Sequence, residues 1–458
     1  MQLYSYQQKA LEFFRKRQKV FLALDMGLGK TVICLKAIQE MNLKALVIAP
    51  LEVAISTWPE EIEKWKLNLS YKILHGKTKN KSFNTKCDIH LINYEGLNWL
   101  YSKLYDQFKK DKSFPYNCLI LDESTAIKDS KTARFKILDA VQDMFEYKVC
   151  LSGTPAPNAL FDLWGQYYIL NGGESLGKSF RSFMSQYYEK DSYRLYCFKL
   201  KRGARDDIYS SISSSTFRLS EDDYANLPDK VQTKSYLVFP SKIQALYKQF
   251  QNDFTLALKD TQIETFNQAA LSCKSRQFIQ GFIYENLCGG DRAVHSIHNY
   301  KVRALKTFIE QNKGKNILCA IQYKHEQDML AKEFPEAKFF TGSTSRKERK
   351  EILKTWNEKK IPLLIVHPKT VSKGLNLQYG GHILVWYALT YSLLDYLQLN
   401  KRLHRTGQKS TVLIHHIIVK KTIDELVYKA LQLKNVNQSK LLEYLRLNTK
   451  DFYCGKSL

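Results

Sequence analysis

The sequence lacks the features that mark exported, membrane-spanning and zinc-binding proteins. Its nine cysteines include no C-x-x-C pair and are odd in number, so neither a zinc site nor a disulfide framework is indicated. No stretch approaches the roughly 18 apolar residues of a membrane span. The first residues do not form a charged and then apolar leader. We therefore expect an unexported protein of a reducing compartment, with no membrane partner.

Long Ser, Gly, Pro or Gln tracts are also missing. Apolar residues make up 44% of the 458 residues, which is typical of a folded chain. This length is too great for one ordinary domain, so two are expected. No repeat with a period of roughly 20–50 residues is present, which argues against a solenoid.

Acidic residues are few compared with basic ones. The chain has 70 Lys and Arg against 45 Asp and Glu, a formal charge of +25. A surface with this charge attracts polyphosphates through counterion release, so nucleic acid is the natural partner. A protein that is merely basic and soluble is the alternative.

Short apolar runs alternate with longer amphipathic stretches, a rhythm typical of βαβ units and parallel sheets. In the first half the expected strands are 20–24, 45–49, 72–74, 89–92, 119–121 and 149–151. Between 171 and 315 the rhythm breaks, with a Ser-rich patch at 210–215 and a helical stretch at 241–285. It resumes with expected strands at 317–321, 339–340, 363–366, 383–387 and 413–419.

This organisation predicts an α/β protein with two lobes. The first lobe covers 1–225 and the second covers 226–458, with a helical insertion near 241–300. A tail with helical spacing, 423–447, is expected to pack on the second lobe.

A strand, a glycine loop and a helix follow one another at Asp25-Met26-Gly27-Leu28-Gly29-Lys30-Thr31. Gly27 and Gly29 allow backbone N–H groups to surround phosphates, Lys30 meets the β- and γ-phosphates, and Thr31 offers a hydroxyl to Mg²⁺. Leu24 stands where the strict pattern has a further glycine. A tight turn without a ligand is the alternative.

An acidic pair, Asp122-Glu123, ends another expected strand, where α/β sheets place their chemistry. Asp122 would hold Mg²⁺ through its water shell, and Glu123 would orient and deprotonate the attacking water. An acidic pair at this place can also be a helix cap, but its pairing with the Lys30 loop favours a catalytic site.

Two further segments could respond to the same phosphate. The small polar turn with Ser152 and Thr154 could sense the γ-phosphate and relay its presence, or it could be only a turn. Arg402 and Arg405 are three residues apart, so we expect them on one face of a helix, where both could reach one anion. A solvated basic helix is the alternative.

The order of these segments resembles the superfamily 2 helicases, and within them the Swi/Snf-type ATPases, over nearly the whole chain. The 25–31 loop is close to the family's D-E-M-G-L-G-K-T, which also lacks the early glycine. Asp122-Glu123-Ser124-Thr125 replaces D-E-A-H, and 152–158 followed by Leu163-Trp164 is similar to S-G-T-P-x-x-N and L-W. The run 398–408 matches the closing motif of the family.

The resemblance implies two tandem RecA-like lobes with helical insertions and a C-terminal helix, and a site for ATP and Mg²⁺. It implies that Gln7 contacts the adenine base and that Gln398, Arg402 and Arg405 belong to the closing motif, with the two arginines acting across the cleft. The residues implied to contact nucleic acid are Pro50, Tyr94, Gly342, Ser343, Lys369, Thr370 and Ser372. His367-Pro368-Lys369-Thr370 departs from the usual S-T-R-A, so a threonine contact to DNA phosphate is lost or moved to Thr370 or Ser372.

The function implied is ATP-driven movement along duplex DNA. A strand-separating helicase acting on DNA or RNA and a non-catalytic ATP-binding tether are the alternatives. We expect the cytoplasm of a bacterial or phage-infected cell, near the nucleoid, as the location, and unidentified protein partners remain open. The motif spacing leaves little room for accessory targeting domains.

Overall fold

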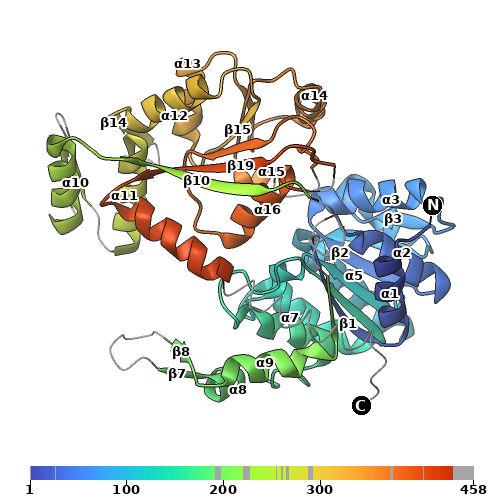
Figure 1. Ribbon diagram of the computed structural model, residues 1–458. Helices are drawn as coiled ribbons and strands as arrows, with labels where there is room; N and C mark the ends of the chain where they lie inside the picture. Colours follow the sequence, from blue (N-terminus) through green and yellow to red (C-terminus); the bar gives the residue numbers. More distant parts are fainter. Residues whose placement is uncertain are drawn as a thin grey trace. The chain divides into compact units, whose positions relative to one another are not determined.

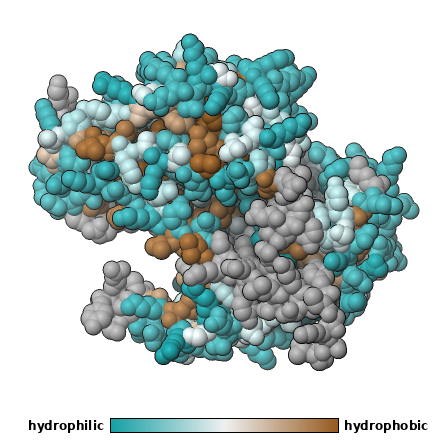
Figure 2. Space-filling model, in the orientation of Figure 1, coloured by the Kyte–Doolittle hydropathy of each residue, from teal (hydrophilic) through white to brown (hydrophobic). Residues whose placement is uncertain are grey.

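The computed structural model (Figure 1) describes residues 2–25, 27–190, 198–219, 227–253, 255–258, 261–264, 268–286, 292–371, 375–405 and 407–436. The chain divides into two compact units, Met1–Ala225 with Lys434–Leu458, and Asn226–Leu433. Within the described ranges, no helix is both long enough and apolar enough to cross a membrane. Hydrophilic residues cover most of the visible surface (Figure 2).

The first unit is built on a seven-stranded sheet whose paired strands are all parallel. In sheet order the strands are β3 (Tyr71–Ile73), β4 (Ile89–Asn93), β2 (Ala45–Ala49), β5 (Cys118–Asp122), β6 (Tyr147–Leu151), β1 (Lys19–Leu24) and β9 (Thr216–Leu219). Most are short apolar runs because both faces of a parallel sheet are covered. The six strands expected in this half are confirmed within one or two residues.

Helices cover both faces of this sheet. Phe21 and Ala23 of β1 point into one apolar cluster, together with side chains of α5, α6 and α7. Leu22 and Leu24 point into the opposite cluster with α1, α2 and α3. The helices are α1 (Ser5–Arg15), α2 (Lys30–Glu40), α3 (Trp58–Lys64), α4 (Lys79–Phe83), α5 (Leu97–Asp111), α6 (Ala133–Val141), α7 (Asp162–Asn171), α8 (Phe180–Tyr187) and α9 (Ala204–Ser213), and β7 (Tyr188–Lys190) pairs with β8 (Phe198–Leu200).

The second unit has a six-stranded sheet, again with parallel pairing throughout. In sheet order its strands are β10 (Lys230–Leu237), β19 (Val412–Val419), β18 (Ile383–Trp386), β15 (Ile317–Ala320), β17 (Leu363–Val366) and β16 (Lys338–Phe340). Its helices are α12 (Tyr300–Gln311), α13 (Lys324–Glu333), α14 (Arg346–Asn357), α15 (Pro368–Val371) and α16 (Leu393–Leu403). The five strands expected here are confirmed, and the two sheets confirm the tandem RecA-like fold class.

The middle of the chain departs from the expectation. The stretch 241–285 is not continuously helical: α10 (Ser241–Asp253) and α11 (Gln268–Gln280) are separated by a hairpin, β11 (Thr255–Leu258) and β12 (Thr261–Glu264). A second hairpin follows, β13 (Phe282–Asn286) with β14 (Arg292–Ser296). In Thr261–Glu264, β-branched Thr and Ile alternate with polar Gln and Glu, which favours a strand over a helix. The helical spacing of the neighbouring segments concealed this signal.

Two strands of the main sheets, β9 and β10, were not predicted, for opposite reasons. β9 follows the Ser-rich patch and contains Arg218, whose charge hides a strand that is buried at every position. β10 is an exposed, polar edge strand, so it has no apolar run. The tail is helical over 423–436, where Val427 and Leu431 enter the core of the second unit, and its expected continuation to 447 lies outside the described residues.

Candidate functional site

Three neighbouring strands of the first sheet deliver the predicted phosphate-binding segments. β5, β6 and β1 lie side by side and run parallel. Their carboxyl ends lead into Asp122-Glu123, the Ser152 turn and the glycine loop. Since adjacent strands are about 4.8 Å apart, the loops that follow them gather at one edge of the sheet.

The glycine loop has the backbone that its sequence predicted. Gly27 and Gly29 have φ of 88° and 78°, in the left-handed region that side chains rarely adopt. Helix α2 begins at Lys30, whose Nζ donates to the carbonyl oxygens of Leu24 (2.8 Å) and Asp25 (3.2 Å). The ammonium group therefore lies at the loop, beside the amino end of α2, the arrangement in which helices bind anions.

Gln7 lies against this loop. Its Nε2 donates to the Leu28 carbonyl oxygen at 3.3 Å, and its Oε1 accepts from the Tyr4 backbone N–H at 3.0 Å. A Cβ on Gly29 would lie 2.3 Å from Gln7 Nε2, so only glycine allows this approach. The position agrees with the resemblance, while the contact of Gln7 with adenine stays a prediction.

Asp122 is held on both its side chain and its backbone. Trp58 Nε1 donates to Asp122 Oδ2 at 3.0 Å, and the Tyr94 hydroxyl donates to the Asp122 carbonyl oxygen at 2.9 Å. Burial raises the pKa of Asp122, against the lowering effects of the Trp58 hydrogen bond and the Lys30 charge. No sequence pattern predicted this contact between Trp58 and Asp122.

Tyr94 is 6% exposed and faces the acidic strand end. Burial, with a further contribution from the Asp122 charge, raises its pKa far above the ordinary tyrosine value. The Tyr94 phenol therefore supports Asp122, and the nucleic-acid contact of its segment stays a prediction.

Glu123 has a backbone conformation unusual for glutamate. Its φ and ψ are 55° and 56°, and a short 3₁₀ turn, Ser124–Ile127, begins directly after it. The left-handed region costs a non-glycine residue about 1 kcal/mol or more. Such a conformation is retained only where the surrounding structure fixes it.

The Ser152 turn is compact and buried. Ser152 Oγ accepts from the Thr154 backbone N–H at 3.1 Å, and the Ser152 N–H donates to the Leu22 carbonyl oxygen at 3.3 Å. Both side chains are at most 5% exposed. The turn is thereby tied to β1, the strand that leads into the glycine loop.

Arg218 is a site residue that sequence reasoning missed. It is 4% exposed on β9, and its guanidinium donates to the Ala23 carbonyl oxygen at 2.8 Å and to the Asp25 carboxylate at 3.2 Å. A buried ion pair of this kind fixes the first residue of the glycine loop. The signal that could have found it is an arginine between two apolar residues, Phe217 and Leu219.

In the second unit the closing motif is only partly helical. Gln398 and Arg402 lie in α16, but the helix ends at Leu403, so the prediction that Arg405 shares a helical face with Arg402 is wrong. Gln408 Nε2 donates to the Leu403 carbonyl oxygen at 3.3 Å and helps to end the helix. The arginines nevertheless converge, since Nη1 of each donates to the Leu375 carbonyl oxygen, at 3.3 and 3.5 Å.

The segments expected to contact nucleic acid differ in exposure. Pro50 is buried after β2, whereas Gly342, Ser343 and Lys369 are exposed. The Thr370 hydroxyl donates to the His367 carbonyl oxygen at 2.7 Å, so it already has a partner within the chain. Ser372, the other position predicted for the moved threonine contact, lies outside the described residues.

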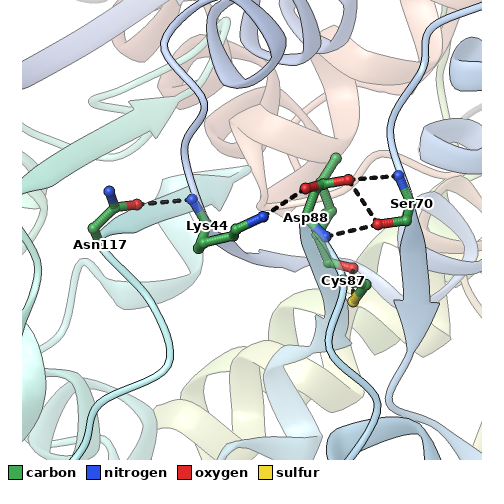
Figure 3. Close-up of polar contacts among 6 residues, drawn as sticks. Lys44, Ser70, Cys87, Asp88 and Asn117 are labelled. Atoms are coloured by element: carbon green, nitrogen blue, oxygen red, sulfur yellow. Dashed lines mark hydrogen bonds and ion pairs between the residues drawn. The ribbon is translucent and has the colours of Figure 1, made fainter.

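A separate cavity of about 880 Å³ lies at the opposite edge of the first sheet, by the amino ends of β2 and β4. Asp88 joins Lys44 Nζ (2.8 Å) to the Ser70 N–H (2.8 Å) and hydroxyl (2.6 Å), and Asn117 accepts from the Lys44 N–H (Figure 3). These contacts tie the beginnings of four neighbouring strands together. Their role is structural.

Two RecA-like lobes, with a glycine-lysine loop and an acidic pair at adjacent strand ends, define the class of helicase-type ATP hydrolases. The model of the SNF2-related domain matches residues 6–284, and the model of the helicase conserved C-terminal domain matches residues 300–407. The chain belongs to the SNF2-related family.

The chain is also similar to two named proteins and to one solved structure. "Putative protein p41" of Acyrthosiphon pisum secondary endosymbiont phage 1 is 32% identical, over 94% of this chain and 95% of its own. "Putative ATP-dependent helicase/translocase YwqA" of Bacillus subtilis is 26% identical over 92% of this chain. The chain spans 46% of that protein, so it corresponds to less than half of this longer relative. The solved "Sulfolobus solfataricus SWI2/SNF2 ATPase core in complex with dsDNA" is 23% identical, over 98% of this chain and 96% of its own, with a TM-score of 0.42.

Proposed function

We propose that this protein hydrolyses ATP in response to DNA and uses the cycle to move along duplex DNA. The observation that carries the proposal is the gathering of the Lys30 loop, the Asp122-Glu123 pair and the Ser152 turn at one edge of a parallel sheet. In an SNF2-related chain, this arrangement supports a nucleotide site in which the presence or absence of the γ-phosphate changes how the chain holds a bound polymer.

In the proposed reaction, Gln7 contacts the adenine base, and Gly27 and Gly29 allow the loop amides to surround the phosphates. Lys30 exchanges the Leu24 and Asp25 carbonyl oxygens for oxygens of the β- and γ-phosphates. Glu123 accepts a proton from the attacking water as the water oxygen bonds to the γ-phosphorus. The bond to the β–γ bridging oxygen breaks, and ADP and phosphate are released.

The Thr31 hydroxyl and the Asp122 carboxylate are oxygen donors of the kind that Mg²⁺ prefers, and Trp58 already orients the carboxylate. We assign Mg²⁺ to these two residues, where it would neutralise charge on the phosphates.

The Arg402 and Arg405 guanidiniums would stabilise the charge of the transferring phosphoryl group, with Gln398 as part of the same motif. Their convergence on Leu375 supports a shared role. Ser152 and Thr154 would relay the presence of the γ-phosphate.

The charge of +25 supports DNA as the partner. The segments proposed to contact it contain Pro50, Tyr94, Gly342, Ser343, Lys369, Thr370 and Ser372. The printed name of the B. subtilis relative contains both "helicase" and "translocase", so strand separation is an outcome to be tested. The similarity to a phage protein agrees with a bacterial or phage-infected cell. We propose the cytoplasm near the nucleoid as the place of action.

Phosphate release should be measured with duplex DNA, single-stranded DNA and RNA at several salt concentrations. We expect the strongest stimulation by duplex DNA, weakening as salt rises. Glu123→Gln should lose about 100-fold or more in rate while still binding ATP. If phosphate release by the parent is not stimulated and Glu123→Gln matches it, the protein is an ATP-binding tether.

Movement is tested separately, by ATP-dependent displacement of a third strand from a blunt duplex. The same preparation is then given a forked duplex. Displacement of the third strand with an intact fork is the expected result. Efficient fork unwinding would instead identify a strand-separating helicase, and stronger stimulation by RNA than by duplex DNA would change the substrate class.

A further inference from the structure

Helix α7 carries three buried polar residues, Asp162, Gln166 and Asn171, among apolar ones. Asp162 and Gln166 are 3% and 0% exposed, whereas neighbours such as Leu163 and Tyr167 belong to the apolar core. Their spacing of four residues puts them on one face of the helix. Burying polar groups is unfavourable unless they are hydrogen-bonded, so their partners indicate what they do.

Gln166 links two loops. Its Oε1 accepts from the Ser124 hydroxyl at 2.7 Å, and its Nε2 donates to the carbonyl oxygens of Pro155 (2.7 Å) and Asp162 (2.8 Å). Ser124 directly follows Glu123, and Pro155 directly follows Thr154. One side chain therefore holds the acidic pair's loop and the Ser152 turn together.

Asp162 repeats the link one helical turn earlier. Its Oδ2 accepts from the Asn158 backbone N–H at 2.8 Å and from Lys128 Nζ at 3.2 Å. Lys128 follows the 3₁₀ turn Ser124–Ile127, and Asn158 belongs to the segment that began with Ser152. Asp162 and Gln166 form two rungs between the same two loops, and we call them the α7 ladder.

Gly165 makes the close contact of α7 with these loops possible. A Cβ at this position would lie 2.6 Å from the Ile127 carbonyl oxygen and 2.9 Å from that of Lys128. Both are backbone atoms that a side chain cannot easily displace. The absence of a side chain therefore allows the ladder to reach both loops.

The ladder also bears on the unusual conformation of Glu123. Asp122, on one side of it, is held by Trp58, and Ser124, on the other side, is held by Gln166. A left-handed glutamate needs such fixed neighbours. Loss of the Ser124–Gln166 bond would release one of the two anchors.

We propose that Gln166 and Asp162 are positioning residues that make the Glu123 loop and the Ser152 turn change position together. This inference rests on the proposed function, in which Glu123 activates water and the Ser152 turn registers the γ-phosphate. The α7 ladder contacts the loop of the acidic pair through Ser124 and Lys128. It contacts the segment of the Ser152 turn through Pro155 and Asn158. Water activation by Glu123 is thereby linked to the position of the Ser152 turn.

The test compares Gln166→Met, Ser124→Ala and the double variant with the parent. The matched control is Tyr167→Phe, which removes another buried hydrogen bond of the same helix, from Tyr167 to Thr216 Oγ1 at 2.7 Å, away from the two loops. The kcat and KM for ATP are measured with saturating duplex DNA, together with Tm. We expect kcat to fall on the order of 10-fold in the ladder variants with KM within about twofold.

The double variant should be no slower than the slower single variant, because both changes remove the same bond. Tyr167→Phe should keep the parent kcat despite a similar loss in Tm. The proposal is overturned if Gln166→Met matches Tyr167→Phe in kcat, or if the two single effects multiply. Should Gln166→Met fail to fold, Ser124→Ala, which removes one oxygen atom, still tests the proposal.

A parent protein whose ATP hydrolysis is not stimulated by DNA contradicts the proposed function and not the α7 ladder. The kcat without DNA is then compared among the same variants to test the ladder.

Discussion

The indole N–H of Trp58, at the beginning of α3, donates to a carboxylate oxygen of Asp122, at the end of β5. The bond is buried, since Trp58 is 0% and Asp122 is 7% exposed. The indole binds Oδ2 of the carboxylate and not Oδ1. This bond links a residue of no assigned function to the proposed metal ligand.

Trp58→Phe should therefore weaken the response to Mg²⁺. Loss of an orienting partner of a metal ligand typically reduces metal affinity about 10-fold or more. We expect a rise of that order in the Mg²⁺ concentration for half-maximal ATP hydrolysis. The control is Trp65→Phe, which removes the bond from Trp65 Nε1 to Glu61 Oε2, away from the strand end. Equal Mg²⁺ curves for the two variants would contradict the role given to Trp58.

Gln7→Ala should reduce the selection of ATP over GTP. The variant loses the bonds from Gln7 to the Leu28 carbonyl and from Tyr4 to Gln7, together with the amide proposed to contact the base. We expect KM for ATP to rise about 10-fold, the effect of one or two buried hydrogen bonds, with little change for GTP. Gln8→Ala, at the exposed neighbouring position, is the control and should leave both KM values unchanged.

Arg405→Ala should lower kcat by a factor of about 10³ with a small change in ATP affinity. The reason is that the guanidinium is proposed to stabilise charge that develops only during phosphoryl transfer. Single-turnover hydrolysis and binding of a fluorescent ATP analogue separate the two quantities. Lys409→Ala removes an exposed charge from the same loop and serves as the control. A variant that hydrolyses ATP at the parent rate would remove Arg405 from the proposed mechanism.

Asp88 should make the stability of the first unit depend on acid. Burial opposes ionisation, but hydrogen bonds from Lys44 and Ser70 outweigh it and lower the pKa of Asp88 from 3.8 to about 2. A lowered folded-state pKa gives stability that is complete above about pH 4 and is lost as the pH falls towards 2. Part of this shift is screened by solvent, so we expect about 1–2 kcal/mol.

Urea unfolding of the parent and Asp88→Asn, followed by tryptophan fluorescence between pH 2 and 7, measures this contribution. The difference between the two should be largest at neutral pH and should shrink to a small remainder as the pH falls to 2. Asp111→Asn, at the exposed end of α5, is the control. A difference that stays constant with pH would mean that the Asp88 charge is not the cause.

The two-sheet architecture could be predicted from the sequence because the signals for its strands lie in neighbouring residues. Runs such as Ala45–Ala49 are apolar at every position, which is typical of a strand covered on both faces. Gly27 and Gly29 indicate a backbone conformation that only glycine adopts freely. Lys30, Asp122 and Ser152 were placed at strand ends for the same reason. The roles assigned to them in catalysis stay predictions.

What local patterns could not give were partners distant in the chain. Arg218 looked unsuited to a strand because its partner Asp25 is far away in sequence, and the buried ion pair became evident only when β9 was found beside β1. The helix ending at Leu403 was likewise hidden, because part of its C-terminal cap comes from the Gln408 side chain after a turn.

By itself, the sequence determined the family, the positions of most strands of the two main sheets and the glycine loop after β1, since each of these depends on neighbouring residues. The tertiary structure alone decided that Trp58 supports Asp122, that Arg218 neutralises Asp25 and that α7 joins the loops of Glu123 and Ser152. These contacts connect segments brought together by the sheet order, and hydrogen bonds between distant segments leave no periodic trace in a sequence.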